Sequence, residues 1–76
     1  MTAGDLTDLL TGSLAKTHGG SRRSWRAALG AIKILDRGTH PHCNWSVAPS
    51  GTRSEISAIE DLLDDVRLSH PFVTAG

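Results

Sequence analysis

The side chains best suited to bind a metal gather in one short stretch, where His40, His42 and Cys43 lie within four residues of one another. Imidazole nitrogen and thiolate sulfur are ligands that zinc and copper accept. Structural zinc sites usually combine two well-spaced pairs of ligands, whereas this chain has a single cysteine. We therefore expect no metal and no cofactor, and His40, His42 and His70 are the candidate ligands if a metal does bind.

Nucleophilic catalysis at Cys43 would need a base within hydrogen-bonding reach. Cys43 lies in a segment of alternating polarity, and adjacent residues of a strand point to opposite faces, so His42 is poorly placed to serve it. The acidic residues of the last third of the chain form i, i+4 pairs on a face expected to be exposed and solvated. No Walker loop, GxGxxG or HExxH motif occurs. The sequence predicts a protein that is not an enzyme.

Charge is unevenly distributed along a chain whose net charge is zero. Residues 16–42 contain six basic residues and one acidic residue, whereas residues 43–76 contain two basic and five acidic residues. The simplest interpretation is that a basic helix and an acidic helix pack side by side and complement each other, within one molecule or across two subunits. Otherwise these faces are available to a different partner.

A small non-catalytic protein-binding module is the function that this pattern favours, either an adaptor or an inhibitor of a larger host or phage protein assembly. The candidate protein-binding residues form two sets of charged side chains: Arg22, Arg23 and Arg26, and Glu60, Asp61, Asp64 and Asp65.

Nucleic-acid binding is the alternative, because arginines surround Trp25 at the start of a predicted helix, where guanidinium groups and the helix N-terminus could both meet phosphate. Its candidate residues are Arg22, Arg23, Trp25, Arg26 and Lys33. The zero net charge and the pI of 6.9 argue against it. Trp25 would otherwise pack in the core between helices.

Three helices are expected to position these side chains, at about residues 5–17, 21–37 and 53–68. Each places apolar residues on one face at helical spacing. Thr52 and Glu55 form a capping box at the start of the third helix. Gly30 interrupts the second helix, and the alternative is that this helix ends there and residues 31–35 form a strand that pairs with the next segment.

Two strands are expected at about residues 43–48 and 71–74. In the first, Cys43, Trp45 and Val47 alternate with polar or small residues, so Trp45 should be in the core. A strand, a helix and a strand in succession suggest two parallel strands joined by a right-handed crossover. The predicted fold class is α+β, with an N-terminal helical hairpin followed by a strand-helix-strand unit. It forms a single small domain over residues 1–76, with a loose N-terminus at 1–4.

The chain is small, at 8.1 kDa, and a domain of this size buries only about 60% of the surface that its unfolded chain exposes. A two-stranded sheet is marginal alone, so its exposed edges suggest a homodimer. The single cysteine and the lack of a signal-peptide pattern indicate a cytoplasmic protein. The longest apolar-rich run, residues 25–35, is too short to cross a bilayer, so no membrane partner is expected.

Overall fold

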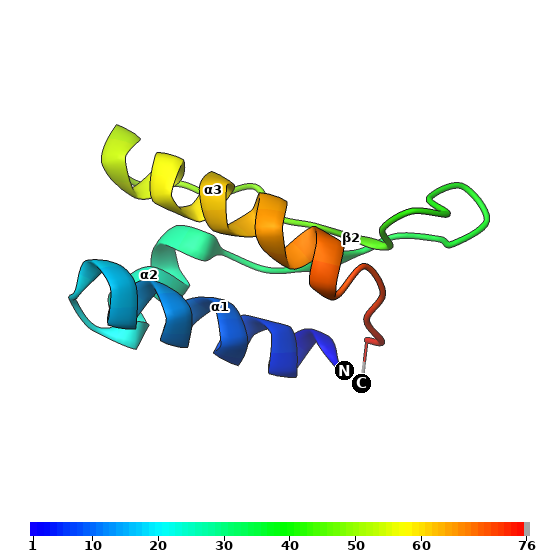
Figure 1. The fold of residues 1–76 in the computed structure, drawn as a ribbon, viewed down its shortest axis with the longest axis horizontal. Coiled ribbons are helices and arrows are strands. Elements are labelled where there is room, and N and C mark those ends of the chain that lie inside the picture. The colour runs from blue at the N-terminus through cyan, green and yellow to red at the C-terminus, as the bar shows by residue number, and fades with distance from the viewer. Residues whose placement is uncertain (76) are drawn as a thin grey trace.

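The computed structural model describes residues 1–75 and contains three helices and a two-stranded sheet. In chain order these are α1 (Ala3–His18), α2 (Arg22–Leu29), β1 (Lys33–Ile34), β2 (Trp45–Ser46) and α3 (Arg53–Ser69). Helices α1 and α3 run alongside one another in opposite directions, with α2 at the far end from the two termini (Figure 1). The α+β class and the N-terminal helical hairpin are confirmed.

Helix α1 begins at Ala3, two residues earlier than predicted, because Thr2 caps it. The Thr2 hydroxyl accepts a hydrogen bond from the Asp5 N–H at 3.1 Å, and the Asp5 carboxylate accepts one from the Thr2 N–H at 3.1 Å. The segment before the helix is held by Thr74, whose N–H donates to the Met1 carbonyl at 3.0 Å and whose carbonyl accepts from the Ala3 N–H at 2.8 Å. Residues 1–4, expected to be loose, therefore contain a cap and the first residues of a helix.

Helix α2 is shorter than predicted, because it ends at Leu29 and does not extend to residue 37. Gly30 adopts φ 75° and ψ −162°, a conformation that is essentially restricted to glycine, and its N–H donates to the Arg26 carbonyl at 3.0 Å. The alternative, a strand within residues 31–35, is what forms. β1 pairs with β2 in antiparallel register, with Lys33 opposite Ser46 and Ile34 opposite Trp45.

The predicted strand at residues 71–74 and its parallel pairing with the preceding strand are both wrong. Asn44, expected on the exposed face, is only 5% exposed, and its side chain takes the place of a strand partner. Its amide donates to the Val73 carbonyl at 2.7 Å, and its carbonyl oxygen accepts from the Val73 N–H at 2.8 Å. Pro71 has no N–H to give to a ladder, but its carbonyl accepts from the Asn44 N–H at 3.0 Å. Thr74 then forms an isolated parallel bridge with Thr2.

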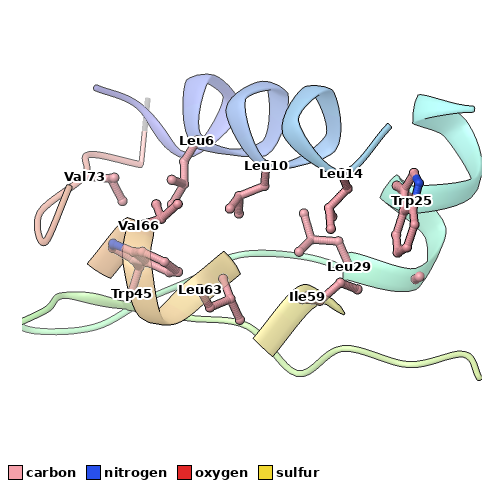
Figure 2. Packing of buried hydrophobic residues seen from close by; sticks show 11 residues of the cluster. Leu6, Leu10, Leu14, Trp25, Leu29, Trp45, Ile59, Leu63, Val66 and Val73 are labelled. Carbon is pink, nitrogen blue, oxygen red and sulfur yellow. The ribbon is translucent and has the colours of Figure 1, made fainter. Parts of the chain in front are cut away.

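The core lies between α1 on one side and α2, β2 and α3 on the other (Figure 2). Trp45 is 2% exposed, as expected of a core residue. Its indole N–H donates to the carbonyl of His70, the C-cap of α3, at 2.9 Å. The indole N–H of Trp25 makes the equivalent hydrogen bond, because it donates to the carbonyl of Gly19, the C-cap of α1, at 2.8 Å. The buried apolar residues are Leu6, Leu10, Leu14, Trp25, Ala28, Leu29, Trp45, Ile59, Leu63, Val66 and Val73.

Each tryptophan therefore contributes both apolar area and a hydrogen bond that closes a helix end. Such helix ends carry carbonyl groups without an intrahelical partner. Across residues 1–75, no helix has the length and apolar character needed to cross a membrane.

Candidate functional site

Three arginines of α2 form a basic surface, which we define as Arg22, Arg23 and Arg26. The Ser21 hydroxyl caps the helix by accepting from the Ser24 N–H at 3.1 Å, and the buried face formed by Trp25, Ala28 and Leu29 leaves the arginines exposed. Together with Asp8 and Thr11 of α1 they line a hollow of about 260 Å³.

Arg22 also crosses α1 closely. A Cβ placed on Gly12 would lie 3.2 Å from the Arg22 Nη2, so the absence of a side chain at Gly12 makes room for the guanidinium. The glycine that weakens the middle of α1 thus has a role in positioning one member of the basic surface.

Four carboxylates of α3 form an acidic surface, which we define as Glu60, Asp61, Asp64 and Asp65. All four are exposed, because the buried face of the helix is formed by Ile59, Leu63 and Val66. Asp64 lies 3.7 Å from Arg67 on the same helix. Asp61 and Asp65 instead stand beside α1.

Asp61 and Asp65 lie on the rim of a groove between α1 and α3, which we call the α1–α3 groove. The groove has a volume of about 240 Å³. Its apolar part comes from Leu14, Ala58 and Leu62, of which Leu14 is fully buried and the other two are half-buried. The α1 side adds the polar residues Ser13, Thr17 and His18. Sequence reasoning missed this groove, because its two walls are far apart in the chain. It identified Asp61 and Asp65 only as an exposed i, i+4 pair.

The basic and acidic surfaces do not pair with each other within the described part of the molecule, so the intramolecular form of the simplest interpretation of the sequence is wrong, whereas pairing across two subunits stays a prediction. Within residues 1–75 the only ion pair closer than 4.0 Å is that of Arg67 with Asp64. Helix α1 separates the two surfaces: Asp8 and Thr11 face the arginines, whereas Ser13 and Thr17 face the carboxylates. Both surfaces are therefore open to solvent.

The candidate nucleic-acid residues are only partly brought together. Trp25 is 8% exposed and packs in the core, so its ring is not available to stack on a base. Its ring centroid lies 5.8 Å from that of His18, in a tilted arrangement. Lys33 is exposed but belongs to β1, so it is on a different element from the three arginines.

The candidate metal ligands also lie on different segments of the chain. His40 and His42 are exposed in the connection between β1 and β2, whereas His70 is the C-cap of α3. Cys43 is half-buried, and its thiol donates to the Trp45 carbonyl at 3.4 Å. In the described part of the chain, no group of three or more His, Cys, Asp or Glu side chains is arranged to hold a metal ion.

The carboxylates with perturbed acidity belong to the helix caps and lie outside both charged surfaces. The hydrogen bonds that Glu55 receives from the Thr52 backbone N–H and from its side chain lower the pKa of Glu55 below its ordinary value of 4.5. The equivalent bonds from Thr2 lower the pKa of Asp5 below 3.8. These groups stabilise helix starts, as in any capping box.

No known protein family, curated protein or solved structure matches this chain. Its binding features are therefore inferred from its own surface, on which the basic surface, the acidic surface and the α1–α3 groove beside Asp61 and Asp65 are the candidates.

Proposed function

We propose that this chain is a small protein-binding module that recognises another protein through its charged helix surfaces. The observation that carries the proposal is the separation of charge. Three arginines of α2 and four carboxylates of α3 are exposed, α1 lies between the arginines and Asp61 and Asp65, and no ion pair joins the two sets among residues 1–75. Unpaired surfaces of one sign steer the encounter with a surface of the opposite sign and fix its register.

Two depressions beside the charged surfaces have dimensions that suit side chains of a macromolecular ligand. The hollow at the basic surface and the α1–α3 groove measure about 260 and 240 Å³. Small-molecule sites usually enclose roughly 300–1,000 Å³. These two depressions therefore suit single side chains of a partner better than a whole metabolite. A third and more open hollow, of about 530 Å³, lies beside the groove and is lined in part by His18, Arg53 and Asp61. The free thiol of Cys43 fits the reducing cytoplasm that we assign to the protein.

Charge reversal tests the proposal. A partner would be captured by crosslinking in the natural host, identified and purified, and its association rate measured with the native chain and with two variants. Arg22→Glu combined with Arg26→Glu reverses part of the basic surface, and Asp61→Lys combined with Asp65→Lys reverses part of the acidic one. Reversal of the surface in use should slow association at low salt by about tenfold or more and weaken its salt dependence.

Lys16→Glu combined with Lys33→Glu is the matched control for the arginine variant, because it makes the same change in net charge at exposed residues outside the two surfaces. This control should change the association rate by less than about twofold. An unchanged rate in both surface variants would reject the proposal.

Nucleic-acid binding is a second candidate, favoured by the position of the three arginines in the first five residues of α2. The free N–H groups of a helix start add positive potential for phosphate there. Asp8, in the same hollow, opposes it. Labelled duplex DNA would be titrated at several salt concentrations, and true binding should show a log–log slope near −0.9 for each phosphate contacted. No salt-dependent binding, or equal binding by Arg22→Gln with Arg23→Gln and Arg26→Gln, would reject this candidate.

A further inference from the structure

We infer that copies of this chain associate head to tail, with Arg22 and Arg26 of one copy bound at the α1–α3 groove of the next. This inference rests on the proposed function, since it uses the same two charged surfaces. It adds the identity of one partner, a second copy of the chain, and the side chains that meet.

The groove has the chemistry of a site for an arginine side chain. Its apolar part, made by Leu14, Ala58 and Leu62, suits a methylene stem, and its rim carries the carboxylates of Asp61 and Asp65. Arginine joins an apolar stem to a planar guanidinium, which binds carboxylates through two parallel N–H donors. A lysine would supply the stem but only a point charge.

The spacing of the two surfaces is the same. Asp61 and Asp65 are four residues apart on α3, and Arg22 and Arg26 are four residues apart on α2. Side chains at i and i+4 are neighbours on one helix face, with about 5–6 Å between their Cβ atoms. The two helices can therefore form two guanidinium–carboxylate pairs at once. All four side chains are exposed and none has an ion-pair partner among residues 1–75.

The placement of the surfaces decides the symmetry. The arginines lie beside Asp8 and Thr11 of α1, whereas the groove lies beside Ser13 and Thr17, on another side of the helix. A copy that binds through its arginines keeps its groove free for the next copy. Such a contact is heterologous, so it extends into a chain of copies unless a ring closes. The edge of β1 is a weaker alternative, because it is two residues long and exposes Lys33, a residue type that discourages strand pairing.

Sedimentation velocity of the full chain across a range of concentrations tests this inference. The native chain should form oligomers at low salt and dissociate at about 0.5 M salt, where the screening length is a few ångströms. Asp61→Asn with Asp65→Asn should be monomeric, as should Arg22→Gln with Arg26→Gln. Glu60→Gln with Asp64→Asn is the matched control, since it removes the same charge from the same helix but outside the groove, and it should still associate.

Mixing the two monomeric variants gives the sharpest result. The groove variant keeps its arginines and the arginine variant keeps its groove, so the mixture should form a heterodimer and nothing larger. Circular dichroism would verify that each variant is folded. A native chain that stays monomeric at millimolar concentration, a mixture without heterodimer, or a matched control that dissociates as fully as the groove variant would overturn the inference.

The same variants separate this inference from the proposed function. If copies do not associate but the arginine or groove variant still slows binding to a different protein, the inference fails and the proposed function stands. If neither association nor partner binding responds to these residues, both fail.

Discussion

A single buried amide, that of Asn44, holds the last described segment of the chain against the sheet. Its side chain donates to the carbonyl of Val73 and accepts from the N–H of the same residue, as a strand partner would. Buried backbone groups without partners are costly, so one side chain here satisfies two groups that would otherwise remain unpaired. Two hydrogen bonds from the Asn44 side chain to the backbone of Val73 thus take the place of pairing between two strands, and we call this contact the Asn44 clamp.

Replacing Asn44 with Ala should lower the free energy of unfolding by about 2–4 kcal/mol, because the Val73 N–H and carbonyl each lose their partner. Urea denaturation would measure this change, and amide hydrogen exchange at Val73 should accelerate in the same variant. Thr39→Ala, which removes an exposed hydroxyl from the turn after β1, is the control and should stay within about 0.5 kcal/mol of the native chain. A loss below about 1 kcal/mol for Asn44→Ala would mean that other contacts hold the segment.

Sequence reasoning located the charged residues of the candidate site but not its shape. Polar side chains that fall off an apolar helical face are expected to be exposed, so the exposure of Arg22, Arg26, Asp61 and Asp65 could be predicted. The groove depends on how α1 packs against α3, and no local pattern encodes that contact. The Asn44 clamp was missed for a related reason, because a lone asparagine in an alternating segment looks like a solvent-facing residue.

At the scale of elements, the start of α3 could be predicted from the sequence, whereas the end of α2 could not. The capping box of Thr52 and Glu55 is a local pattern of two residues three positions apart, and α3 begins at Arg53 as predicted. The end of α2 was not predictable from periodicity, because Ile32 and Leu35 continue the apolar spacing past Gly30. The backbone conformation of Gly30 decided the outcome.

Gly12 and Gly30 should respond oppositely to alanine. Gly12 lies inside α1, so Gly12→Ala should raise the unfolding free energy by about 0.5–1 kcal/mol, with the flexible end of Arg22 moving aside. Gly30 has φ 75°, so Gly30→Ala should lower it by about 1–3 kcal/mol. Thermal unfolding would show both, at about 4–8 °C per kcal/mol for a domain of this size. Stabilisation by Gly30→Ala would instead indicate a helix that continues through residue 30.

The capping box of α3 should make the free energy of unfolding depend on pH in the acidic range. Because its partners lower the pKa of Glu55 in the folded state, the stabilisation is complete above the ordinary value of 4.5 and is lost as pH falls through the lowered pKa. Glu55→Gln should therefore be less stable than the native chain at pH 7, and this difference should shrink as pH falls below about 4.5. Urea titrations at several pH values would test this. Glu60→Gln, outside the cap, should stay within about 0.5 kcal/mol of the native chain.

At the scale of the whole molecule, α1 both packs against the core and separates the two charged surfaces. Its buried face contributes Leu6, Leu10 and Leu14 to the core, and its flanks separate the arginines from the carboxylates. One helix therefore serves both stability and the distribution of charge. A change that tilts α1 should alter the hollow at the basic surface and the groove together.

The bridge between Thr2 and Thr74 brings the two ends of the chain close together, at the end of the molecule away from α2 (Figure 1). A circular permutant, with the termini joined by a short linker and the chain opened between the exposed residues His40 and Pro41, should fold with a similar secondary structure by circular dichroism. Failure to fold would mean that the connection between β1 and β2 must be intact for the sheet to form. The same closeness means that a fluorescent protein fused to either terminus would leave α2 uncovered, so both fusions should report the same self-association.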